Sequence, residues 1–389
     1  MKIRTLIVID NLHTGGVATS LYNFLSYAHS YMDISLLVFN EESINHERIP
    51  NDIHLLKPQK CLHILGKTQK EISVESNFFA LVRMVMVVIS RFLNGELARK
   101  ILLPYIDVVG DFDLALAYSQ DDGWKSISKG CIDFIISKVV AKKKACIIHC
   151  DYSNFGGYNY RQEKELARLD YILCVSNSCK QSFLDCFPLL ETKTITCQNF
   201  IDVARIRSSV DFSSRNNDGK ICFVTVSRLG AEKGLDRVIR AFKILLDKGY
   251  KNFFWTIVGG GPEFSVLSNS VQESNLQQYV YFAGNQDNPY QYIYGSDYFL
   301  LPSYHEAAPM VYGECASLGV PVITTNTCSA LELVSNQGLG LVVENNDDAI
   351  LEIIENILKG DVDIKIPMLP DEVINKNASE QLKSFLQII

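Results

Sequence analysis

Short apolar runs alternate with helix-length segments along the chain, and this alternation constrains the fold more than any other feature. In the first half, the runs that predict β-strands are residues 3–9, 34–39, 114–118, 145–149, 171–175 and 194–197. In the second half, they are residues 221–227, 253–258, 279–282, 298–301 and 320–324. Such alternation is typical of parallel sheets that are covered by helices on both faces. The sequence therefore predicts an α/β fold.

The two sets of strands predict two domains. A chain of 389 residues is long enough for two or three separate cores. Between the two sets lies a polar stretch without periodicity, "VDFSSRNNDGK" (Val210 to Lys220), which predicts a linker. We expect two doubly wound, Rossmann-like parallel-sheet domains at residues 1–204 and 205–372. The last residues, 373–389, are expected to form a helix that packs back toward the first domain.

The charge of the chain argues against one class of partner. The net charge of −7 does not suit nucleic-acid binding, which normally requires a basic surface. The charge is also uneven. Residues 1–200 hold 22 Lys and Arg against 21 Asp and Glu, which leaves 15 against 23 for the remainder. The first half is therefore close to neutral, and the second half carries the acidic excess.

The eleven cysteines are odd in number and form no C-x-x-C pair. Cys146, Cys174 and Cys222 fall within strand-like runs, where a reduced thiol behaves as a small hydrophobic side chain. This interpretation is favoured over a metal site or disulfides, and it suits a reducing cytoplasm. The chain starts directly with the strand-like run "MKIRTLIVID", so we expect no signal peptide and a cytoplasmic protein.

Open α/β sheets bind ligands beyond the carboxyl ends of their strands, so the loops that follow strands carry the candidate site. After the first strand, "NLHTGG" brings Gly15 and Gly16 to the start of a helix. Glycines allow a ligand to approach the backbone, and the helix amino terminus favours an anion. The alternative is a plain turn that needs a flexible glycine.

The loop after strand 221–227 contains two cations, Arg228 and Lys233, before a helix whose apolar face begins at Leu235. The helix dipole disfavours cations near the amino terminus, so an anionic ligand would explain both residues. The alternative is that both are solvated surface cations.

A third loop, "VGGGPE", follows strand 253–258, and its central Gly260 can bring a backbone amide close to a phosphate. A dinucleotide fingerprint would need glycine where the chain has Phe264, so a nicotinamide site is not expected.

The fourth loop leads into "SYHEAAPMVYGECASLGVPVITT" (Ser303 to Thr325), which holds two glutamates eight positions apart. We expect a helix with Pro309 in its first turn that ends near Leu318, where Gly319 caps it. Glu306 then lies in the loop and Glu314 about one and a half turns into the helix. Both carboxylates can accept hydrogen bonds from the hydroxyls of a sugar-like ligand. The alternative for Glu314 is an ion pair with a nearby cation.

At this point the sequence resembles the retaining glycosyltransferases of family 4, also called group 1, which have the GT-B fold. The resemblance covers nearly the whole chain, and its most specific part is the E-x7-E motif followed by "ASLGVPVITT". "SRLGAEKGLDRVIRAF" and "VGGGPE" resemble the phosphate loop and the next glycine loop of the family. "DYILCVSNSCKQSFLDCF" and "QNFID" resemble its interdomain region. The resemblance implies two Rossmann-like domains that face each other across a cleft.

The resemblance also implies roles in donor binding. Arg228 and Lys233 would hold the diphosphate and stabilise charge on the leaving nucleotide. Glu314 would bind the ribose, and Glu306 would hold the donor sugar together with the backbone around Ala308.

Further positions complete the expected site. Pro309 and Met310 belong to the backbone that would hold the sugar, and the amides of Met310 and Val311 would face the phosphates. From the first domain, Gly15 and Gly16 would approach the phosphates and the acceptor. His149, in "CIIHCDYS", matches the histidine that faces the reacting sugar, although a lone histidine is more often structural.

The expected activity is transfer of a hexose-type sugar with retention of configuration, without a metal or other cofactor, and with a UDP-sugar favoured over a GDP-sugar. The expected acceptor is a glycan or a lipid-linked molecule in bacterial surface polysaccharide synthesis. The chain has Glu306-Ala307-Ala308 where the family often has Glu-Gly-Phe, so the donor sugar is not implied. It also has Asn199-Phe200 where Asn-Gly is frequent. The alternatives are a nucleotide-sugar epimerase of the same fold and a noncatalytic partner subunit.

One apolar segment, Phe78 to Leu93, raises the question of a membrane. It is too short, and with Arg83 and Arg91 too charged, to span a bilayer that needs about 20 apolar residues. One hypothesis is a helix that lies on the inner face of the cell membrane, with the near-neutral first half facing the lipid. Because "ALVRMVMVVI" is apolar on nearly every side, a helix buried in the core is the alternative.

Overall fold

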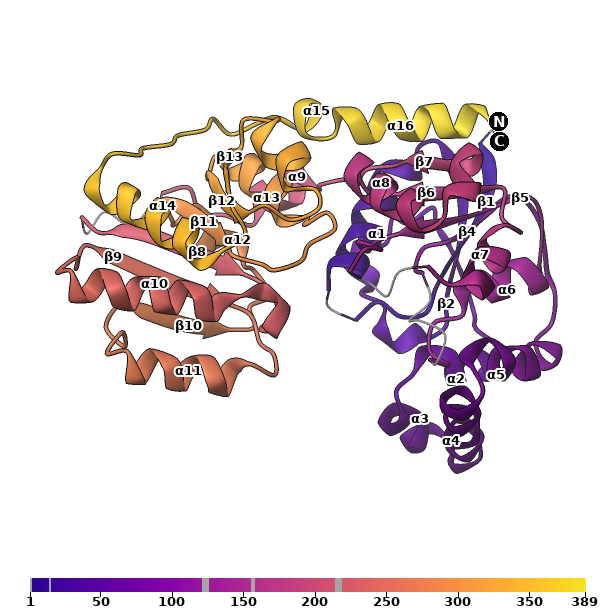
Figure 1. The fold of residues 1–389 in the computed structure, drawn as a ribbon. Helices are drawn as coiled ribbons and strands as arrows, with labels where there is room; N and C mark the ends of the chain where they lie inside the picture. The colour runs from indigo at the N-terminus through magenta and orange to yellow at the C-terminus, as the bar shows by residue number, and fades with distance from the viewer. Residues whose placement is uncertain (1, 14, 121–125, 155–157, 214–218) are drawn as a thin grey trace. The chain divides into compact units, whose positions relative to one another are not determined.

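The computed structural model describes the whole chain except residues 1, 14, 121–125, 155–157 and 214–218 (Figure 1). The middle of the predicted linker, 214–218, thus lies outside the described residues. The chain forms two compact units. Unit 1 contains residues 1–200 and 377–389, and unit 2 contains residues 201–376. The sequence analysis placed the corresponding boundaries at 204 and 373.

Unit 1 is built on a parallel sheet with the strand order β3-β2-β1-β4-β5-β6-β7. Its strands are β1 (Ile3–Ile9), β2 (Met32–Val38), β3 (His54–Leu56), β4 (Val109–Ala117), β5 (Val139–Ile148), β6 (Tyr171–Cys174) and β7 (Thr194–Thr196). Its helices are α1 (Gly16–Ala28), α2 (Lys60–Gly66), α3 (Gln69–Glu75), α4 (Asn77–Phe92), α5 (Gly95–Leu102), α6 (Cys131–Lys138), α7 (Tyr160–Leu166), α8 (Asn177–Cys186) and α16 (Lys376–Gln387). Thr5 of β1 pairs with Ile34 on one side and Leu114 on the other, so the direction of winding reverses between β1 and β4.

Unit 2 repeats this architecture with the parallel strand order β10-β9-β8-β11-β12-β13. Its strands are β8 (Ile221–Val226), β9 (Phe253–Val258), β10 (Val280–Gly284), β11 (Tyr298–Leu301), β12 (Val322–Thr325) and β13 (Gly340–Val343). Its helices are α9 (Val203–Ser208), α10 (Leu235–Asp247), α11 (Phe264–Glu273), α12 (Tyr290–Tyr294), α13 (Val311–Leu318), α14 (Asp347–Lys359) and α15 (Asp371–Ile374). β8 and β11 are paired neighbours, and the winding reverses between them.

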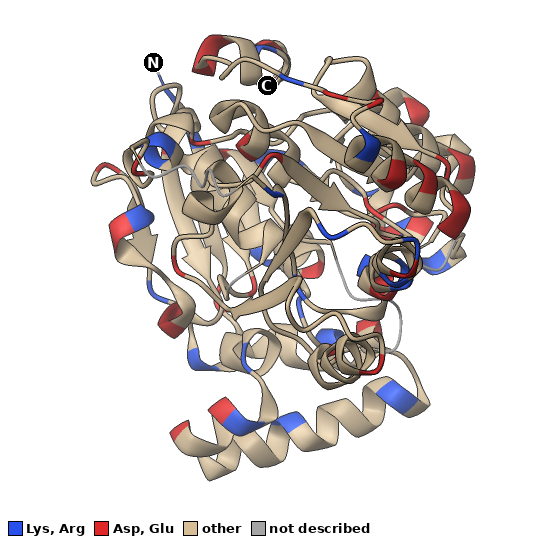
Figure 2. Cartoon of the chain, turned by 90° about the vertical axis from the view of Figure 1, so that its left-hand side faces the viewer, with Lys and Arg blue, Asp and Glu red and all other residues tan. Residues whose placement is uncertain are grey.

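The sheet of unit 2 is buried on both faces. Successive side chains of a strand point to opposite faces, and Phe223 packs in the cluster of α10, α11 and α14 while Val224 packs in the cluster of α9, α12 and α13. The strands of unit 2 contain no Lys, Arg, Asp or Glu, so the charges lie on the helices and loops around them (Figure 2). Uniformly apolar strands are what a parallel sheet between two helical layers requires.

The carboxyl-terminal helix α16 belongs to unit 1. Its Ala378, Leu382 and Phe385, spaced four and three residues apart, are buried. The ring of Phe385 lies 5.5 Å from that of Tyr171 in β6. The backbone N–H of Gln198 donates to the side chain of Gln381 (2.8 Å). One helical face and one capped amide therefore attach the end of the chain to the sheet of unit 1.

The predicted strands match the apolar runs, but two strands begin earlier than predicted and two others were not predicted. β4 and β5 start five and six residues earlier than predicted, at Val109 and Val139. Charged residues interrupt the apolar pattern in both added stretches, and Lys142 of β5 pairs with Asp113 of β4 (2.8 Å). β3 and β13, each at one edge of its sheet, were not predicted.

Candidate functional site

The most specific feature of unit 2 is an ion pair at the carboxyl edge of its sheet. Lys233 follows β8 and Glu306 follows β11, the two strands between which the winding reverses. The Lys233 ammonium lies 2.7 Å from Glu306 Oε1, and Ser303 Oγ donates to the same oxygen (2.7 Å). The side chains are 19% and 11% exposed. In doubly wound sheets this reversal point is where ligands bind.

Arg228, the second predicted cation, has a different environment. Its side chain is 65% exposed and pairs with Glu232 (2.6 Å). Exposed pairs of this kind contribute about 1 kcal/mol or less to stability. The interpretation of Arg228 as a solvated surface cation therefore stays open, whereas the same interpretation is wrong for the largely buried Lys233.

A glycine holds the two loops together. Gly234 has the left-handed φ of 62°, and a Cβ there would lie 2.4 Å from the carbonyl oxygen of Pro302. The loop after β8 is thus pressed against the loop after β11, which is what brings Lys233 to Glu306.

Sequence analysis missed Arg237, which fastens the same two loops. Its guanidinium is almost fully buried in the first turn of α10 and donates to the Pro302 carbonyl (3.2 Å), to Asn345 (2.7 Å) and to Asp347 (2.9 Å). The available signal was an arginine beside the apolar Val238, in a first turn that the helix dipole makes unfavourable for a cation.

The helix after the E-x7-E motif begins later than predicted. Its first residue is Val311, so Pro309 precedes the helix. The first bond of the α-helical type runs from the N–H of Glu314 to the carbonyl of Met310 (3.2 Å). Glu314 is consequently in the first turn, not one and a half turns in, and it is buried. A carboxylate there interacts favourably with the helix dipole.

The end of this helix agrees with the prediction. Gly319 follows Leu318 with a left-handed φ of 69° and caps the helix. At the other end, Ala308, Pro309 and Met310 are half-buried at the edge of the sheet, next to Glu306 in the chain.

The glycine loop after β9 is packed against the loop after β8. A Cβ on Gly259 would lie 1.9 Å from the carbonyl oxygen of Ser227, and one on Gly261 would lie 2.3 Å from that of Leu229. Gly260 accepts a hydrogen bond from the N–H of Leu229 (2.9 Å), and a Cβ on it would meet the side chain of Asn285 at 3.0 Å. Close backbone packing therefore already explains Gly259 and Gly261 without a ligand.

Gly15 and Gly16 of unit 1, in contrast, are not closely packed. Gly15 has an extended φ of 164°, and Gly16 is the first residue of α1. Neither has a left-handed φ. A Cβ on Gly16 would meet nothing within 4 Å, and one on Gly15 would touch only the His13 carbonyl, at 4.0 Å. The alternative of a turn that needs flexible glycines is therefore wrong, and the described residues leave open space beside both.

His149 follows β5 at the same edge of unit 1. Its backbone N–H donates to Gln120 Oε1 (3.1 Å), and its ring Nε2 lies 3.0 Å from the Tyr118 carbonyl oxygen. Because a carbonyl only accepts, Nε2 carries the hydrogen and donates to it. Desolvation lowers the pKa of His149 to about 4, and the charge of Lys129 adds to this effect. The imidazole is therefore neutral near pH 7.

Buried polar residues that the sequence analysis did not select lie at the reversal point of unit 1. Asp10 follows β1 and accepts hydrogen bonds from Ser119 Oγ (2.9 Å) and from the side chain of Asn11 (2.6 Å). Ser119 and Gln120 lie just beyond β4 and are buried. The available signal was the position of each polar residue directly after a strand.

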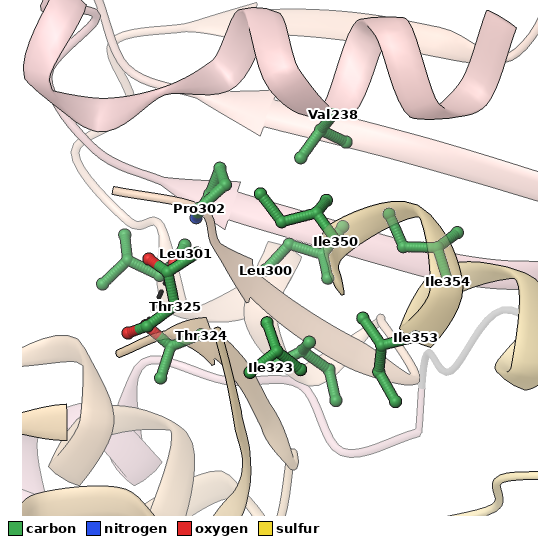
Figure 3. Close-up of a pocket in the computed structure, with 11 residues that line it drawn as sticks. Val238, Leu300, Leu301, Pro302, Ile323, Thr324, Thr325, Ile350, Ile353 and Ile354 are labelled. Carbon is green, nitrogen blue, oxygen red and sulfur yellow. Dashed lines mark hydrogen bonds between the residues drawn. The ribbon is translucent and has the colours of Figure 1, made fainter. Parts of the chain in front are cut away.

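A small cavity lies behind the Glu306 loop (Figure 3). Its lining is mostly aliphatic and comes from α10, α14, β11, β12 and β13, with Val238, Leu300 and Ile354 among the residues that point into it. Thr325 donates from its hydroxyl to the Ser303 carbonyl (2.5 Å) at one end. The residues that line the cavity are uncharged. We therefore assign the cavity to the core of unit 2, behind the loop that holds Glu306.

Comparison with known proteins finds similarity mainly over unit 2. Residues 207–379 match the model for glycosyl transferases group 1. The capsular polysaccharide biosynthesis glycosyltransferase CapM of Staphylococcus aureus is 32% identical over 142 residues, which is 34% of this chain and 35% of CapM. N-acetyl-alpha-D-glucosaminyl L-malate synthase of Bacillus anthracis is 28% identical over 194 residues, 48% of this chain and 47% of the synthase. The match thus spans less than half the length of these relatives.

The fold matches solved structures over its whole length. Anabaena HepE, solved in complex with UDP and glucose, superposes with a TM-score of 0.68 and covers 100% of both chains at 14% identity. Likeness at this identity concerns the fold alone, and it confirms the predicted GT-B architecture of two parallel-sheet α/β domains. The family match over unit 2 and the fold of both units together support a group 1 glycosyltransferase.

Proposed function

We propose that this protein is a retaining glycosyltransferase that transfers a sugar from a nucleotide diphosphate sugar to a glycan or lipid-linked acceptor. The observation that carries the proposal is the Lys233–Glu306 pair across the reversal point of unit 2. A cation and an acceptor of hydroxyl hydrogen bonds at one point suit a ligand that joins a phosphate to a sugar.

The donor contacts divide among the residues of unit 2. Lys233 and Arg228 bind the diphosphate and stabilise the charge that develops on the leaving nucleotide. Glu314, buried in the first turn of α13, binds the ribose hydroxyls. Glu306 binds hydroxyls of the donor sugar.

The remaining contacts come from backbone. The segment from Ala308 to Met310 borders the sugar, and the amides of Met310 and Val311 meet the phosphates at the start of α13. Gly260 faces the phosphates through its backbone. A Cβ at position 260 would meet the side chain of Asn285 at 3.0 Å, so packing within unit 2 also favours glycine there.

Both cations must exchange partners when the donor binds. In the structure Lys233 is paired with Glu306, and Arg228 with Glu232. A diphosphate is a stronger partner than either carboxylate because it carries more charge and more acceptor oxygens. Release from Lys233 leaves Glu306 free to accept hydrogen bonds from the sugar. Glu306 thus occupies the place of the phosphate until the donor arrives.

The residues of unit 1 contribute neutral groups. Gly15 and Gly16 leave open space at the start of α1, where backbone N–H groups attract phosphate oxygens. His149 is neutral at physiological pH and faces the reacting sugar in this proposal. A neutral imidazole adds no charge to a site where the leaving group must remain the anion.

We propose the usual retaining course for the reaction. The acceptor hydroxyl oxygen bonds to the anomeric carbon on the face from which the leaving group departs. The bond from that carbon to the phosphate oxygen breaks, and its electron pair stays on the nucleotide diphosphate, which takes the hydroxyl proton. Arg228 and Lys233 supply the positive charge that this step needs, so we propose that no metal ion is required.

The donor nucleotide and the biological setting follow from the similar proteins. A UDP-sugar is favoured because HepE was solved with UDP and glucose. Synthesis of a bacterial surface polysaccharide is favoured because CapM is a capsular polysaccharide biosynthesis glycosyltransferase.

A thermal-shift screen with nucleotides and nucleotide sugars tests donor binding, because a ligand that binds only the folded state raises the melting temperature. We expect UDP and one or more UDP-sugars to raise it, with and without EDTA. Lys233→Ala should reduce the shift, and Lys251→Ala, at an exposed lysine of unit 2, should keep it. Product analysis of the donor that binds, with candidate acceptors, then separates the alternatives. Conversion of the donor to an epimer or to free sugar and nucleotide, without an acceptor-linked product, would indicate an epimerase. Absence of any nucleotide-dependent shift would favour a noncatalytic subunit and overturn the proposal.

A further inference from the structure

Helix α4 of unit 1 exposes apolar side chains that a surface helix normally buries. Its buried residues include Arg83 and Ser90, and Arg83 donates to the Lys67 carbonyl (2.8 Å). A helix on the surface of a globular protein normally turns its apolar face to the core. Here two of the four buried side chains are polar, the other two being Ala80 and Met86, and several large apolar residues are left outside. The alternative of a helix buried in the core is therefore wrong.

The outward residues form one continuous stripe. Phe78, Leu81, Val85, Val88 and Phe92 recur at alternating intervals of three and four, which places them along one face of the helix. They are between 48% and 84% exposed. We call this stripe the apolar ridge.

Neighbouring elements extend the apolar ridge. Of the 28 exposed large apolar side chains in the described part of the chain, twelve lie between Val74 and Val108. They include Val74 of α3, Leu97 and Ile101 of α5, and Tyr105. Single exposed apolar residues are ordinary, but a concentrated patch marks a surface that is covered in use.

The charge around the apolar ridge indicates what covers it. Residues 60–102 contain seven Lys and Arg and three Glu, a net charge of +4 in a chain of net charge −7. Of the seven cations, Lys67, Arg83 and Arg99 are buried, and Lys60, Lys70, Arg91 and Lys100 are exposed. α4 itself contains two arginines and no acidic residue. It is the long helix that runs along the bottom of Figure 2.

We propose that the apolar ridge binds the surface of an anionic lipid bilayer, with α4 lying parallel to the membrane. Its apolar side chains enter the boundary between headgroups and acyl chains, and the surrounding cations meet anionic headgroups. With 16 residues, α4 is about 24 Å long, a suitable length for an interfacial helix. No helix among the described residues is long and apolar enough to cross a membrane, so the contact is with the surface.

A second copy of the chain is a less suitable occupant. A two-fold contact between two ridges would bring the cations of both copies together, and like charges at an interface are unfavourable. α4 also lies, with α3 beside it, at the end of unit 1 (Figure 1). A bilayer accommodates such a helix by moving lipid aside. The inference does not depend on the proposed function, because binding to vesicles requires neither donor nor acceptor.

Co-sedimentation of the full chain with vesicles tests the proposal. We expect it to pellet with vesicles of phosphatidylglycerol and phosphatidylethanolamine at low salt, less at high salt, and little with phosphatidylcholine alone. The double variant Val85→Glu/Val88→Glu should lower the partition coefficient about tenfold or more by placing two charges on the apolar ridge. The matched control is Val140→Glu/Val266→Glu, which makes the same change at two exposed valines outside it. It should bind as the unchanged protein does.

Three results would overturn the proposal. One is a protein that remains in the supernatant with every vesicle and salt concentration. Another is an equal loss of binding in the ridge variant and the control, with thermal unfolding confirming that both are folded. The third is a dimer, seen by sedimentation equilibrium, that Val85→Glu/Val88→Glu dissociates while no vesicle binds, because the occupant would then be a second copy.

Discussion

The carboxyl edges of the two sheets carry different chemistry, although the two units share one architecture. In unit 2 the edge holds charges that neutralise one another, as Lys233 and Glu306 do. In unit 1 the candidate ligand contacts are neutral: His149, whose pKa is lowered, and Gly15 and Gly16, which leave open space, while the Asp10 carboxylate is buried and hydrogen-bonded to Ser119 and Asn11. A site that binds an anion needs charges that can change partners. A site that admits a neutral acceptor needs space and hydrogen bonds.

The difference also shows in the glycines. Gly259 and Gly261 of unit 2 are required by close packing, because a Cβ on either would overlap a backbone carbonyl. Gly15 and Gly16 are not required by anything in the described part of unit 1. Glycines that the fold does not need are better candidates for ligand contact than glycines that it does.

The largest effect is expected at the cations of unit 2. Lys233→Ala should lower the turnover of sugar transfer on the order of 10²-fold or more, because it removes charge stabilisation from the leaving diphosphate. Arg228→Ala should cause a loss of similar order even though its side chain is exposed in the free protein. Steady-state rates at saturating donor measure both, with Lys251→Ala as the control. Near-normal rates in both variants would remove the contrast between a charged and a neutral edge.

The glycine comparison predicts effects on two different quantities. Gly259→Ala should lower the free energy of unfolding by about 2 kcal/mol or more, because it combines a φ of 135° with overlap of a carbonyl. Gly16→Ala should leave stability unchanged or raise it by up to about 1 kcal/mol, since alanine favours a helix and has room there. It should nevertheless lower turnover by about tenfold if phosphate approaches this backbone.

Chemical denaturation and rate measurements on both variants test the distinction. A Gly16→Ala protein with full activity would mean that the open space in unit 1 is not used by the donor. A Gly259→Ala protein with unchanged stability would mean that the two loops of unit 2 are less tightly packed than the structure indicates.

The two glutamates of the E-x7-E motif are expected to contact different parts of the donor. Glu306→Gln should retain or slightly increase affinity for UDP alone, since Lys233 loses its competing partner, while sugar transfer falls about tenfold. Glu314→Gln should weaken UDP itself by about tenfold, because the ribose loses a charged acceptor. Calorimetry with UDP and with the UDP-sugar separates these effects. Equal losses for both ligands in both variants would contradict the division of roles.

Sequence reasoning predicted unit 2 better than unit 1, and the reason is physical. Lys233 and Glu306 could be identified because each lies in a loop after an apolar strand, and the order of strands in such a fold brings those loops together. Their ion pair could not be predicted, because it depends on the contact of Gly234 with Pro302.

Two further failures have the same origin. Arg237 was missed because burial of an arginine is decided by partners more than a hundred residues away, Asn345 and Asp347. The orientation of α4 was left open because its sequence is apolar almost all round. The buried Arg83, held by Lys67, decides which face is inside, and that contact is tertiary.

The smallest effect, and the last way to test the comparison, concerns the neutrality of unit 1. The unfolded chain protonates His149 near the ordinary pKa of about 6.5, and the folded chain does so near 4. Above this window the imidazole is neutral in both states and stability does not depend on it. As the pH falls from about 6.5 toward 4, only the unfolded state gains the proton, so the free energy of unfolding decreases. His149→Gln, whose amide can replace the Nε2 donor to Tyr118, should lose this part of the pH dependence, whereas His54→Gln, at an exposed position, should keep it. Denaturant unfolding between pH 4 and 8 measures the difference.

If the His149→Gln protein shows the same dependence as the unchanged protein, the imidazole is not held neutral by its surroundings. The edge of unit 1 could then carry a positive charge, and the contrast with unit 2 would have to rest on the glycines alone.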